Sequence, residues 1–367
     1  MTWSPASKCT KVLNFILPSH NNVRAEKVLF TELFLLACST LLILLLVHSS
    51  LVGSAKGKSH QPNASTSNLP KPPDGSKFAV LPSGMKIRYT DSGSSFVVEN
   101  NKEYKTLLFI HGFGGCLETW IPLQKLLCQK FRVVAIDLPG SGFSDKPLQF
   151  CYSYRNLGTV VLSFIETMDL SNVILVGHSS GCVVVASSAS SNRVRGAVLV
   201  ASGGLFQVKP KLFSYRITKP LLKYFANKFI QKRKESLMKL HRNKDSLLPE
   251  ILFAFTAQAD IKNYKEVMVE MFCASEPPYS EVLCDVNVPL HFIWSENDTT
   301  SPLAEAEEKL NSMIQEGNIH VKVTEAMIND SLHYIQHEQP QRLADEVSKF
   351  AQACCNDERS QTGIPES

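Results

Sequence analysis

Cysteine pairs with the Cys-x-x-Cys spacing are absent from the 367-residue sequence, although it contains ten cysteines. The spacing that does occur indicates neither a zinc site nor a dense disulfide framework, and we expect no cofactor. A strong charge of one sign is also missing, because the formal net charge is only +4. So mild a charge gives no reason to expect nucleic acid as a partner. No internal repeat is visible, which argues against a repeat architecture.

The composition, by contrast, is that of a folded protein. Apolar residues make up 44% of the chain and charged residues 20%, so the chain can bury a sizeable core and wholesale disorder is not expected. A length of 367 residues suits one α/β domain of about 250 to 300 residues with appendages.

Positive charge is concentrated in residues 207–246. This stretch holds twelve Lys or Arg residues against two Asp or Glu, a local charge of +10, so the rest of the chain sums to −6. Such a block can face an acidic surface, and anionic lipid is one candidate. A solvated helical face explains the same pattern at least as well. The block includes Lys228, Lys232, Arg233 and Lys234.

A long apolar run lies near the N-terminus. Residues 33–47 read LFLLACSTLLILLLV, and weaker flanks extend the run over residues 28–52, about the 20 residues that a bilayer requires. A cleaved signal peptide is the main alternative, but its apolar core is usually shorter and is not preceded by a tail as long as residues 1–27. We therefore expect a single-pass membrane anchor, whose orientation the flanking basic residues leave open.

A polar stretch separates this run from the rest of the chain. Residues 53–77 are rich in Ser, Pro, Asn and Lys and have almost no apolar content, which is typical of a flexible linker. We expect it to tether a folded domain, beginning at residue 78, a short distance from the membrane.

The folded part shows a series of short apolar runs. The first two, 77–81 and 85–93, flank Ser83-Gly84 and predict two strands around a tight turn. Most of the later runs end in Gly and resemble fully buried parallel strands. With helical stretches between them, they predict an α/β fold with a mostly parallel, eight-stranded sheet covered on both faces. The later runs are residues 106–112, 131–140, 173–181, 196–204, 289–298 and 319–327.

Helical patterns complete the domain organisation. Residues 117–128, 154–168 and 339–353 are expected helices between or after the strands. Residues 206–285 contain no strand-like run and carry amphipathic helical spacing, which predicts an inserted helical cap. The core is then divided into residues 78–205 and 286–353, and residues 354–367 form a C-terminal tail.

One motif carries chemistry. The stretch VILVGHSSGCVVV places Ser179 between Gly177 and Gly181, after an apolar strand and before a helix-compatible run. Gly-x-Ser-x-Gly alone occurs often by chance, but this context is that of a nucleophile elbow, a sharp turn that exposes the serine hydroxyl. A side chain at either glycine would collide with the neighbouring strand or helix. We interpret Ser179 as a candidate nucleophile.

A serine nucleophile needs hydrogen-bond donors for the developing oxyanion. The stretch HGFGG, residues 111–115, closes an earlier strand and can aim the Phe113 N–H at the site, while the Ser180 N–H supplies a second donor. We expect His111 and His178 to be structural, because the first precedes the turn and the second adjoins the serine.

A base and an acid complete the expected constellation. Asp298 follows a strand end, and His333 lies in the loop between the last strand and the last helix. The chain order Ser179, Asp298, His333 is the one expected for this arrangement. His337, Glu296 and Asp330 are rivals, but His337 is expected in the following helical turn and Asp330 is very close in sequence to His333.

These residues carry a resemblance. Over about residues 78–353 the chain resembles an α/β-hydrolase-fold serine hydrolase, through HGFGG, DLPGSGFSDKP, GHSSG, IWSEND and LHYIQHEQP in this order. The resemblance implies a triad of Ser179, Asp298 and His333. Three positions depart from the pattern, because Leu332, Ser295 and Cys182 stand where family members often have Gly.

The resemblance also narrows the reaction. Epoxide hydrolases and haloalkane dehalogenases use Asp at the elbow, so Ser179 disfavours them. Acyltransferase-like relatives carry a His-x-x-x-x-Asp motif, and the absence of this motif from the sequence disfavours them as well. Ester, thioester or amide hydrolysis remains, with C–C hydrolysis as a related possibility. With its expected anchor, the chain looks like a membrane-bound monoacylglycerol-lipase-type enzyme acting on small lipid esters. A non-enzymatic membrane-tethered binding protein is the alternative. The expected cap is rich in phenylalanine, which would suit an acyl chain but could equally serve only to pack the cap on the core. These residues are Phe206, Phe213, Phe225, Phe229, Phe253 and Phe255.

Overall fold

The computed structural model describes residues 70–362, except Asp74 and residues 94–104, 203–218, 275–277 and 301–302. The expected tail, the expected anchor at residues 28–52 and most of the expected linker lie outside the described residues. No helix in the described part of the chain is long and apolar enough to cross a membrane.

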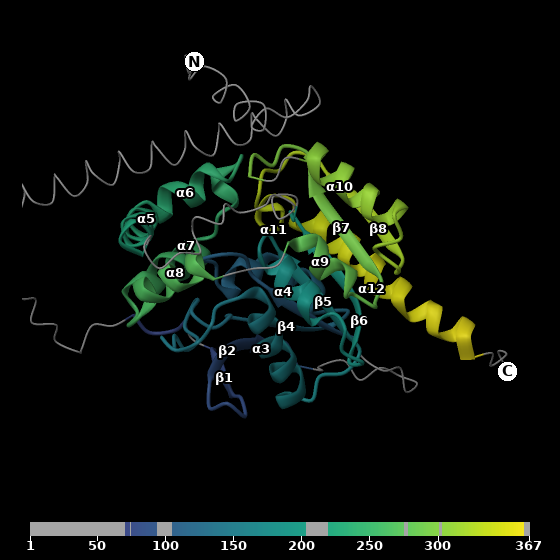
Figure 1. Cartoon of the computed structure of the whole chain (residues 1–367), viewed down its shortest axis with the longest axis horizontal. Coiled ribbons are helices and arrows are strands. Elements are labelled where there is room, and N and C mark those ends of the chain that lie inside the picture. The colour runs from purple at the N-terminus through teal and green to yellow at the C-terminus, as the bar shows by residue number, and fades with distance from the viewer. Residues whose placement is uncertain are drawn as a thin grey trace, which may run out of the picture. The chain divides into compact units, whose positions relative to one another are not determined.

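Eight strands form one sheet in the order β1-β2-β4-β3-β5-β6-β7-β8. The pairs β1–β2 and β2–β4 are antiparallel, and every other neighbouring pair is parallel. The mostly parallel, eight-stranded sheet expected from the apolar runs is thus confirmed (Figure 1). The strands are β1 Lys77–Val80, β2 Lys86–Asp91, β3 Thr106–Ile110, β4 Arg132–Ile136, β5 Val173–His178, β6 Val194–Val200, β7 Leu290–Ser295 and β8 Val323–Ile328.

The central strands are largely apolar because both faces of the sheet are covered there. Every residue of β3, β5 and β7 is buried. Successive side chains alternate between the faces: Leu108 and Ile110 belong to one apolar cluster, whereas Leu107 and Phe109 belong to the other.

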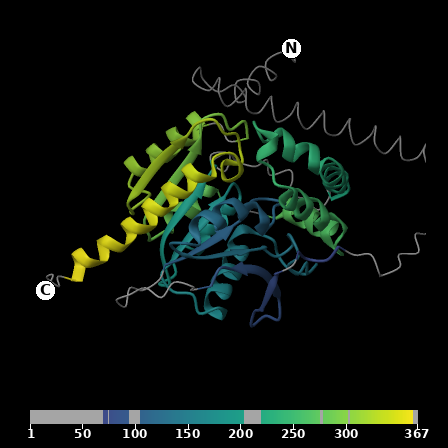
Figure 2. The same ribbon diagram turned by 180° about the vertical axis from the view of Figure 1, so that it is seen from behind.

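Helices lie on both faces of this sheet (Figures 1 and 2). The first cluster takes side chains from α3 (Tyr154–Thr167), α4 (Gly181–Ser188), α9 (Tyr279–Cys284) and α10 (Leu303–Gln315). The second takes them from the 3₁₀ helix η3 (Leu117–Trp120), α2 (Ile121–Leu127), α11 (Ile335–Glu338) and α12 (Pro340–Thr362).

Two helices differ in extent from the sequence prediction. The helix expected over residues 117–128 is divided into η3 and α2. Pro122 explains the division, since a proline lacks an N–H and fits only the first turn of a helix, so α2 begins anew there. The helix expected over residues 339–353 continues as α12 to Thr362, into the segment predicted as a tail.

Between β6 and β7 every described element is helical. The helices α5 (Lys219–Gln231), α6 (Arg233–Lys239), α7 (Pro249–Ala257) and α8 (Tyr264–Cys273), here called the cap helices, gather at one side of the sheet (Figures 1 and 2). Short 3₁₀ turns, Lys244–Ser246 and Gln258–Asp260, connect them. The helix α9 differs, because it packs on α4 and its Val282 and Leu283 belong to the core. The segment predicted as cap, residues 206–285, thus includes one helix of the core.

Candidate active site

Ser179 occupies a strained turn between β5 and α4. Its φ is +52°, a left-handed conformation that a residue with a side chain rarely adopts. The Ser179 N–H donates to the Val200 carbonyl at 2.9 Å, which ties the turn to the end of β6. Strain of this kind persists where surrounding structure fixes it, often at functional sites, and it is the backbone geometry expected of a nucleophile elbow.

The two glycines of the motif are required by close backbone contacts. A Cβ on Gly181 would lie 2.6 Å from the His111 carbonyl oxygen and 2.7 Å from that of Ile110. A Cβ on Gly177 would lie 2.8 Å from the Gly181 carbonyl oxygen. The collisions expected from the sequence are therefore real: one is with the end of β3, the other with the start of α4.

Asp298 and His333 meet although they follow different strands. Asp298 comes after β7 and His333 after β8, and because the carboxyl ends of parallel strands meet at one edge of the sheet, their loops adjoin. His333 Nδ1 lies 2.7 Å from Asp298 Oδ2, and both residues are buried. In this pairing the imidazole donates from Nδ1 to the carboxylate.

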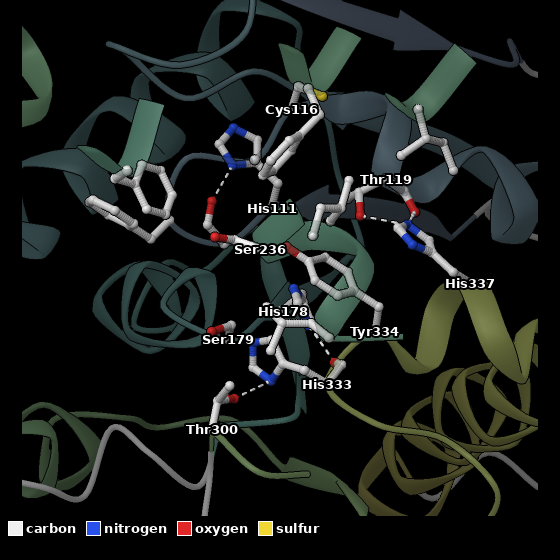
Figure 3. Close-up of a pocket in the computed structure, with 18 residues that line it drawn as sticks. His111, Cys116, Thr119, His178, Ser179, Ser236, Thr300, His333, Tyr334 and His337 are labelled. Atoms are coloured by element: carbon white, nitrogen blue, oxygen red, sulfur yellow. Dashed lines mark hydrogen bonds between the residues drawn. The ribbon is translucent and has the colours of Figure 1, made fainter. Parts of the chain in front are cut away.

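Thr300 joins this pair as a third member. Its Oγ1 lies 2.7 Å from Asp298 Oδ1 and also 2.7 Å from His333 Nδ1. The hydroxyl can donate to the carboxylate while its oxygen accepts from the imidazole. Figure 3 shows the His333 imidazole between Ser179 and Thr300. In the described residues no protein group bonds to His333 Nε2, which leaves that nitrogen available to the pocket.

Hydrogen bonding keeps the acid of this pair charged. Burial alone would raise the pKa of the Asp298 carboxyl, but bonds from His333 and Thr300 outweigh it and hold this pKa below its ordinary value. A charged carboxylate fixes the imidazole tautomer with the proton on Nδ1 and stabilises the imidazolium that forms when Nε2 takes up a proton.

The turn at residues 112–115 carries the expected oxyanion donor Phe113. The Gly115 N–H donates to the Gly112 carbonyl at 3.0 Å, and Gly114 has a φ of +63°. Within the described part of the chain, neither the Phe113 N–H nor the Ser180 N–H donates to another protein group. A Cβ on Gly112 would lie 3.1 Å from Ser179 Cβ, so this turn directly adjoins the serine.

The histidines expected to be structural have buried polar partners. His111 Nδ1 donates to the Gly112 carbonyl at 2.7 Å, and its Nε2 accepts from the Leu138 N–H at 3.0 Å. His178 Nε2 donates to the His333 carbonyl at 2.9 Å. Burial, reinforced by the neighbouring His333, lowers the pKa of His178 to about 3. Both rings therefore support the loops around Ser179 in neutral form.

The rivals for the acid and base are engaged elsewhere. His337 is buried between cap and core: its Nδ1 lies 2.7 Å from His241 Nε2, and its Nε2 lies 2.9 Å from Thr119 Oγ1. Asp330 is exposed and pairs with Arg242 at 3.0 Å. Glu296 is exposed. None of the three contacts His333 in place of Asp298.

The departures from the family pattern are accommodated by specific contacts. Ser295 Oγ donates to the Ser331 carbonyl at 2.7 Å, which links the end of β7 to the loop of His333. The Leu332 N–H donates to Glu338 Oε2 at 2.8 Å. The buried Cys182 thiol lies 3.3 Å from the Gly177 carbonyl oxygen. Of the three, only the Ser295 side chain links two loops of the site, since Leu332 bonds through its backbone N–H.

A pocket of about 190 Å³ opens at Ser179. Core residues Ser179, Phe113 and His333 line it together with cap residues, and none of the described side chains that line it is Lys, Arg, Asp or Glu (Figure 3). Of the cap phenylalanines singled out in the sequence, Phe229 and Phe255 line the pocket, whereas Phe225 and Phe253 are exposed. Phe206 and Phe213 lie outside the described residues.

One member of the basic block is not on the surface. Lys228, Lys232 and Lys234 are exposed, but Arg233 is only 2% exposed. Its guanidinium donates to the Gly114 carbonyl at 2.7 Å and to the Tyr264 hydroxyl. The interpretation of Arg233 as part of a face toward an acidic surface is therefore wrong, because the side chain turns inward between cap and core.

Sequence reasoning missed three polar residues that support the site, namely Thr300, Arg233 and Gln258. Gln258 is fully buried, donates to the Gly114 carbonyl at 3.0 Å and accepts from the Gly142 N–H at 2.8 Å. Thr300 could have been suspected from its place two residues after Asp298. Arg233 and Gln258 carry no local signal, since the contacts that bury them come from distant parts of the chain.

The chain is similar to known proteins in sequence and in fold. YugF, an uncharacterized hydrolase of Bacillus subtilis strain 168, is 23% identical over 270 residues, which cover 72% of this chain and 96% of YugF. A thermophilic esterase from Thermogutta terrifontis superposes with a TM-score of 0.59 at 18% identity, over 76% of this chain and 98% of the esterase. A bacterial membrane phospholipase A gives 0.60 at 20% identity, over 90% of this chain and 99% of the phospholipase.

At these identities the solved structures establish likeness of fold alone. The model of the alpha/beta hydrolase family matches residues 107–346, which span the sheet from β3 to β8, the cap helices and the loops of Ser179, Asp298 and His333. The chain therefore belongs to the alpha/beta hydrolase family.

Proposed function

We propose that the protein is a serine hydrolase that cleaves carboxylic esters with an apolar acyl group. The observation that carries the proposal is the 2.7 Å contact between His333 Nδ1 and Asp298 Oδ2, in a pocket that also exposes Ser179. With Nδ1 occupied by the carboxylate, His333 Nε2 is the nitrogen that can take the serine proton.

The reaction proceeds in two halves. Ser179 Oγ attacks the ester carbonyl carbon as its proton passes to His333 Nε2, and the carbonyl oxygen becomes an oxyanion held by the Phe113 and Ser180 N–H groups. Collapse expels the alcohol, which takes the proton from His333, and leaves an acyl group on Ser179. Water, deprotonated by His333, then attacks this acyl-enzyme and releases the carboxylic acid.

The pocket lining supports the substrate class. Apolar side chains of the cap, including Phe229, Leu237, Ile251 and Phe255, face the serine. Because none of the described side chains that line the pocket is Lys, Arg, Asp or Glu, an anionic or cationic acyl group would lose its hydration without gaining a partner among them, which is costly. A neutral, apolar acyl chain suits this surface, as in simple lipid esters.

Association with a membrane is the second part of the proposal. The apolar run at residues 28–52 is long enough to span a bilayer, and the polar residues 53–77 would tether the hydrolase domain beside it. The exposed Lys228, Lys232 and Lys234 of the cap would attract an anionic surface, each lysine near that surface contributing about 1 kcal/mol at physiological salt.

Matched variants test the hydrolytic proposal. We expect the wild-type protein to hydrolyse a soluble p-nitrophenyl ester, and His333→Ala to lower kcat by roughly 10⁴-fold or more, by analogy with other triads. Asp298→Asn should cost somewhat less, and His337→Ala should retain turnover. If His337→Ala abolished turnover and a folded His333→Ala protein did not, the assignment of the base would be wrong. A well-folded wild-type protein without esterase activity would favour a binding protein on a hydrolase scaffold.

Two kinds of substrate test the membrane proposal. A protein beginning at Ser76 should still cleave soluble short-chain esters, but should hydrolyse long-chain esters in anionic vesicles much more slowly than the full chain. Reversing Lys228, Lys232 and Lys234 together to Glu should deepen the vesicle defect at low salt, with the difference shrinking at high salt through screening. Equal losses on soluble and vesicle substrates would mean that these lysines serve the fold of the cap, and the membrane proposal would fail.

A further inference from the structure

The turn that carries Phe113 is held from two sides. From the core, His111 Nδ1 donates to the Gly112 carbonyl at 2.7 Å. From the cap, Arg233 Nη2 and Gln258 Nε2 donate to the Gly114 carbonyl at 2.7 and 3.0 Å. The residues before and after Phe113 are therefore each held by their carbonyl group, Gly112 by the core and Gly114 by the cap.

Arg233 is an unusual residue to find in this place. It is 2% exposed, and no carboxylate within the described residues forms an ion pair with it. Its guanidinium lies instead over the faces of Phe255 and Tyr264, with the carbon Cζ 4.4 and 5.0 Å from the ring centroids. The Nε atom is buried and has no hydrogen-bond partner in the part of the chain that the structure describes.

If Arg233 served only to stabilise the fold, a buried arginine would be an unfavourable choice. An arginine stays charged in proteins, and burying a charge without an opposite charge is strongly unfavourable, which the aromatic faces, the Gly114 carbonyl and the Tyr264 hydroxyl offset only in part. An apolar side chain would join cap to core at lower cost. A positive charge beside the Gly114 carbonyl, however, favours negative charge that develops at the adjacent Phe113 N–H, and the low dielectric strengthens this attraction.

We propose that Arg233 is a positioning residue of the oxyanion hole, through which the cap completes the catalytic geometry of the core. This inference rests on the proposed function. Arg233 fixes the Gly114 carbonyl, so that the Phe113 N–H stays aimed at the oxyanion. The positive charge of Arg233, which has no ion-pair partner among the described residues, also stabilises the negative charge of the tetrahedral intermediate across the turn. Gln258 supports the same carbonyl, and the Tyr264 hydroxyl holds the other guanidinium nitrogen.

A role confined to joining the cap to the core predicts different kinetics. Loosening the cap would raise KM for esters whose acyl chain fills the pocket and would leave kcat for a short acetyl ester unchanged. Loss of oxyanion positioning lowers kcat for short and long esters by the same factor, because every ester passes through the same oxyanion.

The test compares Arg233→Met and Arg233→Lys with the control Glu235→Gln in the same helix, in the full chain. We expect Arg233→Met to lower kcat on acetyl and octanoyl p-nitrophenyl esters alike, by on the order of 10- to 100-fold, below the loss for removing a direct oxyanion donor. Arg233→Lys, which retains the charge but not the two-armed geometry, should show an intermediate loss. Glu235→Gln, which removes an exposed charge, should behave as wild type.

The affinity for a transition-state mimic distinguishes the two roles, because it should not change if Arg233 only joined the cap to the core. Phenylboronic acid adds to an active serine as a tetrahedral anion, so its inhibition constant should rise in Arg233→Met by a factor close to the loss in kcat. If Arg233→Met fails to fold, Arg233→Lys decides by the same two measurements. Unchanged kcat on the acetyl ester with raised KM on the octanoyl ester, or an unchanged boronate constant, would overturn the inference. Failure of the proposed function itself would be distinguishable, because the wild type would then neither hydrolyse esters nor bind the boronate.

Discussion

His333 Nδ1 lies 2.7 Å from Asp298 Oδ2, although 35 residues separate the two along the chain. The contact exists because β7 and β8 are parallel neighbours, so that their following loops emerge at the same edge of the sheet. The end of β5 brings Ser179 to this edge as well, and the geometry of the whole site therefore depends on the register of the sheet.

The hydroxyl of Thr300 should matter for turnover. Thr300→Val keeps the shape of the side chain but removes the hydrogen bonds of the hydroxyl to Asp298 and His333. A hydrogen bond to a charged group contributes about 1.5 kcal/mol or more. Such a loss from the stability of the transition state corresponds to roughly a tenfold fall in kcat. We expect about a tenfold fall in kcat with little change in KM, measured on a soluble ester. Thr300→Ser, which restores the hydroxyl, should recover most of the rate; equal rates for all three proteins would show that Thr300 does not orient the pair.

The elbow should not tolerate a methyl group at residue 181. In Gly181→Ala the new Cβ would lie 2.6 Å from the His111 carbonyl oxygen, and forced overpacking against backbone costs about 3 kcal/mol. Urea unfolding should reveal this loss together with a fall in activity. Ser187→Ala in the same helix is the control, because the buried Ser187 hydroxyl has no hydrogen-bond partner among the described residues. A Gly181→Ala protein as stable as wild type would contradict the close approach of β3 and α4.

Buried histidines should make the fold sensitive to acid. The pKa of His178 falls from 6.5 to about 3 on folding, so between these values the unfolded chain binds a proton that the folded protein does not, and stability decreases as the pH falls. For this residue the loss between pH 7 and pH 5 is about 2 kcal/mol. Burial lowers the pKa values of His111, His241 and His337 too, and they act in the same direction.

The variant His178→Gln isolates this contribution. Glutamine retains an N–H donor for the His333 carbonyl but takes up no proton in this range, so its unfolding free energy should fall less steeply with acid than that of wild type. Urea unfolding at pH 7, 6 and 5 measures both slopes. Parallel curves for the two proteins would show that His178 is not the neutral, buried group described above.

Local patterns were sufficient to predict the sheet and the elbow. The central parallel strands are short, largely apolar runs, because burial on both faces leaves little place for polar side chains, whereas the edge strand β8 exposes Thr324 and Glu325. The clashes at Gly177 and Gly181 confirm why the motif needs glycine. The pairing of Asp298 with His333 followed from chain order and strand ends, and the structure brings these two residues together.

Local sequence patterns could not predict contacts between residues that are far apart along the chain. Arg233 stands among lysines in a basic stretch and differs from them only in facing Gly114, Phe255 and Tyr264, which are brought to it by the packing of the cap. The assignment of α9 to the core has the same origin, since its contacts are with α4. The predicted anchor at residues 28–52 stays a prediction.

The most direct test of the account is covalent labelling of the serine. A fluorophosphonate probe reacts with a serine hydroxyl only when a base and an oxyanion hole activate it. We expect the full-length protein to be labelled, mass spectrometry to locate the adduct on Ser179, and a folded Ser179→Ala protein to remain unlabelled. Labelling that persists in Ser179→Ala, or a folded wild-type protein that the probe does not modify, would contradict the claim that Ser179 is an activated nucleophile.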